Sequence, residues 1–305
     1  MARATSLSMM DFCVFSFNRG QFLKHCVESI ERCAPTSTVS IYDDASDDRE
    51  TRQVLADLGS RHSVVKSTAD TRNGKHGGLY SNMQRAFEDQ PGNGIVCFIQ
   101  DDMQLVRKLS ESEIELMAMQ LEQRGPRFLH PAFLKGCNRA ADSEEMRYEQ
   151  ELGGYLCNRF GRSAGAHYSD IHISSVAQLR LTEWCFLDKE ALNEQQARGT
   201  LQQMLILRNP FVAWLPNVPA WRGRTRTLAL RRAERKHRSG FYPIRFMSTK
   251  EETEFLERSP HQLPVAEDYL ELYQQNLSEP WQYHPLQNER LYKALDSVER
   301  RLRKR

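Results

Sequence analysis

Residues 94–105 read G-I-V-C-F-I-Q-D-D-M-Q-L, a short apolar run that ends in two acids. The run follows the turn sequence P-G-N-G and is typical of a strand buried on both faces of a parallel sheet. Asp101 and Asp102 then stand at the carboxyl end of that strand, where open α/β sheets bind their ligands. Two adjacent carboxylates are costly to desolvate without a cation. The stretch therefore predicts either a divalent metal with a nucleotide diphosphate, or a solvated turn after a core strand.

Length and composition exclude several classes of protein. The 305 residues, 40% of them hydrophobic, suffice for one large α/β domain with an appendage. No apolar run approaches the ~20 residues of a spanning helix, and the first ten residues lack the apolar core of a signal peptide, so we expect a cytoplasmic protein. The seven cysteines form no C-x-x-C pair, and we expect them to be reduced. The net charge of +2 is near balance, so any contact with polyanions must come from local clusters of charge.

Strands and helices alternate through the first hundred residues. Apolar, β-branched and aromatic runs predict strands at 11–17, 39–42 and 63–66, and helical spacing predicts helices at 21–33, 49–58 and 79–87. This alternation implies right-handed crossovers and a parallel sheet with its ligand crevice at the carboxyl strand ends. Three loops, 16–19, 43–48 and 100–103, are therefore expected to converge.

Four motifs carry a resemblance to a known family. They are V-F-S-F-N-R-G-Q-F-L-K-H-C-V-E-S-I, I-Y-D-D-A-S-D-D, H-G-G-L-Y-S-N-M-Q-R-A-F and I-V-C-F-I-Q-D-D-M, in this order. Together they resemble the nucleotide-binding half of the family 2 glycosyltransferases of the GT-A fold, over the first third to half of the chain. The resemblance implies an α/β, Rossmann-like, mostly parallel central sheet flanked by helices. We predict a GT-A domain over 1–220, with a nucleotide-sugar half (1–109) and an acceptor half (110–220), then a basic loop and helical C-terminal extension (221–305).

The resemblance also assigns donor-binding residues, which are Phe15, Ser16, Arg19, Asp44, Lys75, Asn82 and Asp101. The backbone at Phe15 and Ser16 and the carboxylate of Asp44 would hold the nucleobase. A carboxylate can accept the imide N–H of uracil, a proton that cytosine lacks, so a UDP-linked donor is favoured. An Asx-turn or a helix N-cap is the alternative for Asp44, but Asp47 or Asp48 fits the cap better.

The Q-D-D sequence corresponds to the D-x-D element of the family, although many relatives carry three acids. The resemblance makes Asp102 the first ligand of Mn²⁺ or Mg²⁺, with Asp101 either as a second metal ligand or at the ribose or a metal-bound water. The ion would neutralise charge on the departing nucleoside diphosphate. Lys75 and Arg72 lie in a glycine-rich loop that is not a P-loop, because no Lys-Ser or Lys-Thr follows the glycines. Lys75 and Arg72 would either bind the diphosphate or be exposed to solvent.

The second half of the chain gives weaker signals. A helix at 110–124 and a strand at 128–134 continue the alternation, and the polar, irregular segment 138–162 is expected to face the acceptor. The run L-T-E-W-C-F-L at 181–187 is interpreted as a strand, with Trp184 as a core aromatic.

The general base is where this chain departs from the family, whose enzymes usually provide an acidic pair opening a helix. The corresponding place, 199–203, holds no acid. Glu183 is our first choice of catalytic base, because an apolar strand would raise its pKa, and Asp170 is the second, although it would also suit a turn. The remaining alternatives are a wrong alignment and an inactive protein.

The C-terminal part is basic. Segment 221–239 is rich in Arg, which suits closure over a diphosphate or a phosphorylated acceptor. His237 is either a further metal ligand or a solvated side chain. Nucleic-acid binding is disfavoured, because no recognisable binding module is present. The last helix, 289–305, carries an apolar stripe beside basic residues, so it either packs on the domain or touches an anionic membrane surface.

The sequence thus predicts a metal-dependent, hexosyltransferase-like glycosyltransferase that uses a nucleotide-sugar donor, most simply UDP-linked. The acceptor would be a glycan, a lipid-linked molecule or another small molecule, and the protein would be cytoplasmic or peripheral at the inner face of the membrane. A non-catalytic nucleotide-sugar-binding protein is the alternative from another class. A nucleotidyltransferase is a second enzyme alternative, but the G-x-G-x-R signal expected after its first strand is missing.

Overall fold

The strand predicted at residues 95–99 is β4 (Ile95–Gln100), and it lies inside the central sheet of a computed structural model. The structure describes residues 9–67, 78–92, 94–122, 125–158, 165–221, 226–274 and 277–303. Within these residues the sheet has the strand order β3-β2-β1-β4-β9-β6-β10-β8-β7. All side chains of β4 up to Ile99 are buried, as expected of a strand covered on both faces.

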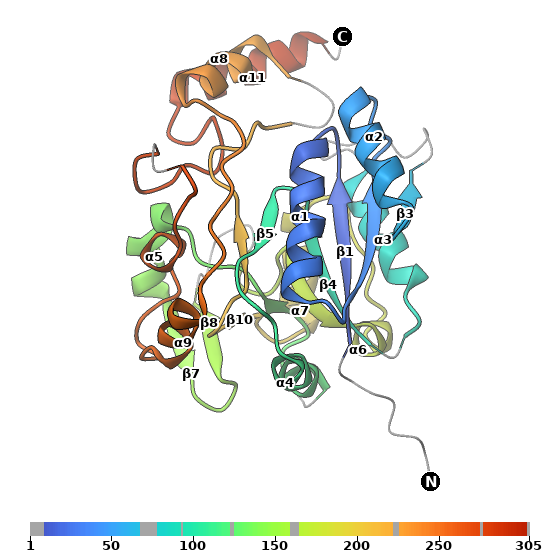
Figure 1. Cartoon of the computed structure of the whole chain (residues 1–305), viewed down its shortest axis with the longest axis vertical. Coiled ribbons are helices and arrows are strands. Elements are labelled where there is room, and N and C mark those ends of the chain that lie inside the picture. Colours follow the sequence, from blue (N-terminus) through green and yellow to red (C-terminus); the bar gives the residue numbers. More distant parts are fainter. Residues whose placement is uncertain are drawn as a thin grey trace.

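The first half confirms the predicted alternation. Strands β1 (Met10–Ser16), β2 (Thr38–Asp43) and β3 (Ser63–Lys66) run parallel to one another, and β1 runs parallel to β4. The helices between them are α1 (Gly20–Cys33), α2 (Arg49–Leu58) and α3 (Leu79–Asp89). The arrows of β1 and β2 point to the same, upper end of the molecule in Figure 1. The predicted α/β fold with a mostly parallel sheet flanked by helices is therefore confirmed.

The second half adds strands of both directions. β9 (His172–Ser175) is antiparallel to β4, and β6 (Leu129–His130) and β10 (Leu205–Leu207) are parallel to each other. β8 (Gly154–Cys157) and β7 (Met146–Glu149) complete the edge as an antiparallel pair.

Two predictions for the second half are wrong. The segment 138–162, expected to be irregular, contains α5 (Arg139–Glu145), β7 and β8, and a 3₁₀ turn (Gly136–Asn138) leads into it. The strand β7 was missed because it is half exposed at the sheet edge and lacks a long apolar run. The predicted strand at 128–134 is reduced to the two residues of β6.

The strand predicted at 181–187 is also wrong. Helix α6 (Val176–Leu181) ends there in a turn, and α7 (Glu190–Thr200) follows. Trp184 and Phe186 are buried while Glu183 and Cys185 are exposed. This alternation is typical of a strand, although the segment pairs with no described strand. Trp184 is a core aromatic as predicted, stacked on Tyr168 with ring centroids 5.7 Å apart.

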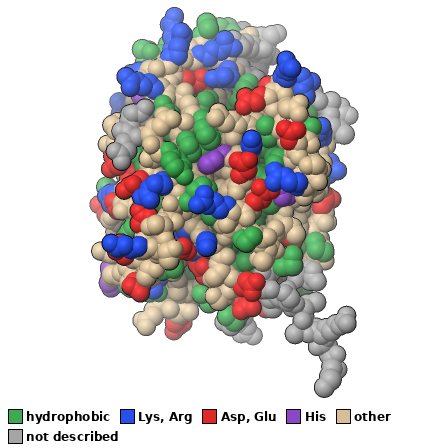
Figure 2. Space-filling model, viewed as in Figure 1, with side chains coloured by type: hydrophobic (Ala, Val, Ile, Leu, Met, Phe, Trp, Pro, Cys, Tyr) green, Lys and Arg blue, Asp and Glu red, His purple; other side chains and the backbone are tan. Residues whose placement is uncertain are grey.

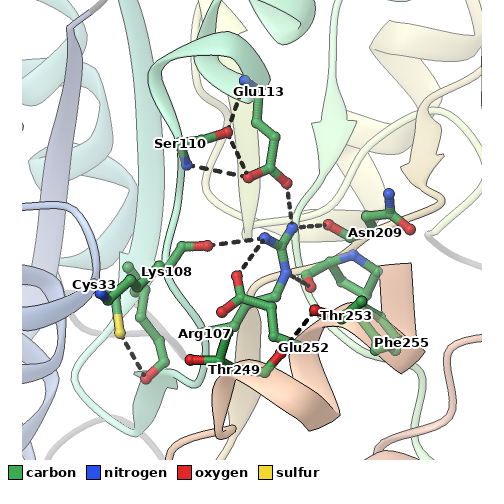
Figure 3. Close-up of polar contacts among 12 residues, drawn as sticks. Cys33, Arg107, Lys108, Ser110, Glu113, Asn209, Thr249, Glu252, Thr253 and Phe255 are labelled. Carbon is green, nitrogen blue, oxygen red and sulfur yellow. Dashed lines mark hydrogen bonds and ion pairs between the residues drawn. The ribbon is translucent and has the colours of Figure 1, made fainter. Parts of the chain in front are cut away.

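A two-stranded ribbon joins the sheet to the C-terminal part. β5 (Met103–Leu105) pairs with β11 (Val212–Trp214), and α4 (Glu111–Glu122) follows β5. Arg107, only 2% exposed, holds this junction together. Its guanidinium donates to Glu113, to the carbonyls of Lys108, Asn209 and Pro210, and lies 3.8 Å from Glu252 (Figure 3). A buried cation is tolerated here because every nitrogen has a partner.

The residues predicted as a C-terminal extension divide into two parts. α9 (Thr249–Glu257) and α10 (Ala266–Tyr269) share a buried cluster with Phe22 and Val106 of the α/β part. α8 (Leu228–Lys236) and α11 (Arg290–Arg303) instead pack on each other at the top of Figure 1. No helix in the described ranges is long and apolar enough to span a bilayer.

Candidate functional site

The three loops predicted to converge do meet at the carboxyl ends of β1, β2 and β4. Asp101 Oδ2 accepts hydrogen bonds from Ser16 Oγ and from the backbone N–H of Phe17, both at 3.1 Å. Asn18 is in the left-handed region, with φ of 50°, and its N–H donates to Ser46 Oγ at 2.9 Å. Asn tolerates this conformation better than most residues. The residues after β1 are thus hydrogen-bonded to the loop after β2 and to the loop after β4.

Arg19 bridges the two acids that follow β4. Its Nη1 lies 2.9 Å from Asp101 Oδ1 and 2.8 Å from Asp102 Oδ2. Burial raises the pKa of Asp101 to about 6, although the Arg19 charge opposes this shift. The sequence motif placed Arg19 in the donor site, but it gave no signal that its guanidinium pairs with both acids.

Whether a divalent metal fits this site depends on which carboxylate oxygens of Asp101 and Asp102 have no protein partner. Both oxygens of Asp101 accept hydrogen bonds, from Ser16, Phe17 and Arg19, so Asp101, predicted as a second metal ligand, is already held by the protein. Asp102 Oδ1, by contrast, is buried and has no hydrogen-bond partner among the described residues. No group of three or more potential metal ligands occurs in the same residues. The described residues thus offer a metal the carboxylate of Asp102, and its remaining ligands would be phosphates and water.

The acids after β2 separate into structural and site residues. Asp48 is the N-cap of α2 and accepts from the N–H of Thr51 at 2.8 Å, which confirms that the cap lies beyond Asp44. The carboxylate of Asp43 accepts hydrogen bonds from the N–H and from the hydroxyl of Ser46. Asp44 is 7% exposed, and its Oδ2 accepts from the N–H of Gly78 at 2.8 Å. A Cβ at position 78 would clash with Asp44 Oδ1, so only glycine allows this approach.

The remaining predicted donor residues lie along the same edge or outside the described residues. Asn82 is buried on α3, and its Oδ1 accepts from Ser67 Oγ at 2.5 Å. The Phe15 ring is part of the core beside Tyr42 and Phe98, while its carbonyl accepts from the N–H of Asp101 at 3.0 Å. Lys75 and Arg72 fall within residues 68–77, which the structure does not describe.

A second acidic group lies across the β4–β9 pairing. Asp170 stands just before β9, and Tyr80 Oη donates to its Oδ2 at 3.0 Å. Burial, followed by the charge of Glu190, raises the pKa of Asp170 to about 8. Asp170 Oδ1 is buried and makes no hydrogen bond within the described part of the chain. This carboxyl group therefore combines burial with an unused oxygen.

Sequence reasoning missed Glu190. It is the first residue of α7, and burial raises its pKa while Lys135 lowers it. The signal was present in D-K-E-A-L at 188–192, which is an acidic pair opening a helix, the arrangement expected for a catalytic base. It was passed over because residues 181–187 were interpreted as a strand and the base was sought near residue 200.

The structure places Glu183 away from this edge. It is exposed in the turn after α6, with φ of 53°, and its N–H donates to the carbonyl of Arg180. Helix α6 begins beside the start of β4, where the N–H of Val176 donates to the carbonyl of Gly94, at the lower end of the sheet in Figure 1. The prediction that Glu183 faces the crevice from an apolar strand is therefore wrong.

The basic segment after Trp221 makes internal ion pairs. Arg226 pairs with Glu234, and Lys236 Nζ lies 2.5 Å from Glu289 Oε1. His237 Nε2 lies 2.8 Å from the same Glu289 oxygen. His237 thus belongs to the α8–α11 contact, which explains its position without a metal.

Comparisons with known proteins give similarity in three dimensions. No protein-family model and no curated protein sequence matches the chain. Residues 1–349 of TarS from S. aureus match 68% of this chain and 60% of their own, with 15% identity and a TM-score of 0.46. Glucosyl-3-phosphoglycerate synthase from Mycobacterium tuberculosis, solved with Mn²⁺ and UDP-glucose, matches 75% of this chain and 76% of its own, with 15% identity and a TM-score of 0.42.

A mannosyltransferase from Pyrobaculum calidifontis, solved with GDP-mannose and Mn²⁺, matches 75% of this chain and 61% of its own, with 11% identity and a TM-score of 0.46. The chain thus spans about 60% of the TarS fragment and of the mannosyltransferase. At these identities and TM-scores the likeness says nothing of this chain's activity or substrate.

Proposed function

We propose that this protein is a GT-A glycosyltransferase that moves a sugar, as a hexosyltransferase would, from a UDP-linked donor to an acceptor. The observation that carries the proposal is Asp102, whose buried Oδ1 has no partner among the described residues, at the carboxyl end of the central strand. Asp101 beside it is fixed by the end of β1. Ligand sites of open α/β sheets lie at such strand ends.

The nucleobase site would be formed by Asp44 with the backbone at Phe15 and Ser16. Asp44 is buried and held by the N–H of Gly78, so its carboxylate has a fixed orientation at the end of β2. An oriented carboxylate can accept the imide N–H of uracil. Asn82 lies in the first turn of α3, and its N–H donates to the carbonyl of the N-cap Gly78, which supports a role for Asn82 in the same part of the proposed site.

A divalent metal, Mn²⁺ or Mg²⁺, would be held by Asp102 together with the donor phosphates. When bound, it would supply positive charge to the departing diphosphate. Arg19 holds the other oxygen of Asp102, so this chain orients the ligand before any metal arrives. Asp101 acts here as a positioning residue, because its hydrogen bonds tie Arg19 to the end of β1.

Asp170 is the proposed catalytic base. In an inverting transfer, the acceptor oxygen forms a bond to the anomeric carbon, the bond from that carbon to the donor phosphate breaks, and the acceptor proton passes to a carboxylate. Asp170 Oδ1 is buried without a partner in the described residues, while Tyr80 fixes the other oxygen. The acceptor would be a glycan, a lipid-linked molecule or another small molecule.

Calorimetry with UDP tests the donor site. Wild-type protein should bind UDP more tightly with Mn²⁺ than with a chelator, and Asp102→Asn should lose this difference. Asp57→Asn, an exposed change on α2, is the matched control. Equal metal-dependent affinity in Asp102→Asn and wild type would remove the proposed metal ligand.

An assay of sugar release with a panel of nucleotide sugars separates an enzyme from a binding protein. Donor hydrolysis or transfer by the wild type supports the proposal. Binding of UDP without turnover of any donor, in the presence of Mn²⁺, would favour the non-catalytic alternative.

A further inference from the structure

Lys135 is a partly buried cation held by two aromatic rings. It follows β6, and its Nζ lies 3.8 Å from the centroid of the Trp214 ring and 4.9 Å from that of Tyr283. Contacts of this kind stabilise an ammonium through the ring quadrupole. They also fix the position of a side chain that would otherwise have four free torsions.

The rings place Lys135 beside the acid pair of the site. Trp214 pairs with Met103 in the β5–β11 ribbon, and the N–H of the next residue, Leu215, donates to the carbonyl of Asp102 at 2.9 Å. Burial lowers the pKa of Lys135, and the nearby carboxylates of Asp102 and Glu190 oppose this shift. Lys135 therefore lies near Asp102 and near Glu190, which belong to the two acidic groups of the site.

Lys135 nevertheless forms no ion pair with them. Among the described residues, no carboxylate oxygen lies within 4.0 Å of its Nζ, and this nitrogen makes no hydrogen bond to any of them. Arg19, the other cation of the site, is in direct contact with both Asp101 and Asp102. An ammonium carries three donors, and aromatic contacts do not replace oxygen acceptors. Its donors are thus available to an anion that binds beside Asp102.

We propose that Lys135 binds the diphosphate of the sugar donor, at the phosphate that carries the sugar. This inference rests on the proposed transferase function. When the bond from the anomeric carbon to the phosphate oxygen breaks, its electron pair stays on that oxygen, and the Lys135 ammonium stabilises the added charge without changing its own protonation. Preorganised charges of this kind act strongly in a site shielded from water.

Calorimetry with UDP, UMP and uridine tests the assignment. Lys135→Met keeps an unbranched side chain of nearly the same length but removes the charge. Loss of a charge-assisted hydrogen bond typically costs ~1.5–3 kcal/mol, so UDP affinity should fall roughly 10- to 100-fold. UMP should lose less and uridine nothing. Lys250→Met, an exposed change on α9, is the matched control.

The outcomes separate this inference from the proposed function. Unchanged UDP affinity in Lys135→Met, with a wild type that binds UDP, overturns the role of Lys135 alone, and it would be the result if Lys135 served an acceptor phosphate. A wild type that binds neither UDP nor GDP overturns the proposed function and this inference with it. Lys135→Arg, which keeps the charge, should retain most of the affinity. An equal loss in Lys135→Arg and Lys135→Met would show a packing role and also contradict the assignment.

Discussion

The acidic residues at the carboxyl ends of the strands differ in their hydrogen bonding from those of the α8–α11 pair. In the helix pair, Asp296 accepts from Thr227 Oγ1 at 2.7 Å, and Glu299 accepts from the first two N–H groups of α8. At the strand ends, Asp102 and Asp170 each keep one buried oxygen without a partner in the described residues. Acids that complete a helix end fix packing, whereas buried acids with an unused oxygen are candidates for chemistry.

The two regions also differ in what they expose. The outer surface of α11 carries Leu291, Leu295, Val298 and Leu302, each between 43% and 69% exposed. The same two helices also carry exposed basic residues, namely Arg231, Arg232 and Arg235 of α8 and Arg290, Lys293 and Arg301 of α11. Figure 2 shows Lys and Arg side chains gathered at this end of the molecule. The helix therefore packs through its polar face and leaves its apolar face outward, so the expectation that it packs on the domain holds for one face only.

The largest expected effect concerns Asp170. Asp170→Asn should lower the transfer rate by about 10²- to 10⁴-fold, the usual range for loss of general-base catalysis, while UDP affinity stays unchanged. Glu183→Gln, at the exposed turn after α6, should leave the rate as in the wild type. Steady-state transfer rates and UDP calorimetry measure both. Full activity of Asp170→Asn would show that the unused oxygen has no catalytic role.

The pH dependence of transfer is the second test. A base must be ionised to accept a proton, so with a pKa of about 8 for Asp170 the rate should rise as pH increases through that value. The charge of Glu190 contributes to the raised pKa, and Glu190→Gln should therefore move the rising limb to lower pH. A profile that keeps its midpoint in Glu190→Gln would contradict the coupling of the two acids.

The third prediction concerns the stability of the helix pair. Asp296→Ala leaves the buried Thr227 hydroxyl without its acceptor, which should lower the free energy of unfolding by about 1–3 kcal/mol. UDP affinity should not change, because the pair contributes no residue to the proposed donor site. Thermal melting and calorimetry check the two quantities. A loss of UDP binding without a change in stability would mean that the two regions are coupled.

The smallest effect on stability is expected for the α11 stripe. Replacing Leu291, Leu295, Val298 and Leu302 by Ser should change the free energy of unfolding by less than about 0.5 kcal/mol per site, because exposed side chains contribute little. If this face touches an anionic membrane, wild-type protein should float with phosphatidylglycerol vesicles and the substituted protein should not. Equal flotation of both proteins would exclude membrane attachment through this stripe.

Much of the fold could be predicted because its signals are local. The ends of α2 and β3 agree with the sequence prediction, since Asp48 caps the helix and apolar residues define the strand. The second half was harder, because β6 and β9 are too short to show a period and β7 is half exposed. Glu183 was misplaced for a related reason, namely that alternating burial in a turn imitates a strand.

The sequence by itself determined where acids follow strands, at Asp43–Asp44 and Asp101–Asp102, because strand ends depend on neighbouring residues. Only the tertiary structure decided which charges meet. Asp170 reaches the site because β9 pairs with β4, and Lys135 reaches it because Trp214 pairs beside Asp102. These contacts join segments more than thirty residues apart, and whether a buried oxygen keeps a partner depends on all of them at once, which no local pattern encodes.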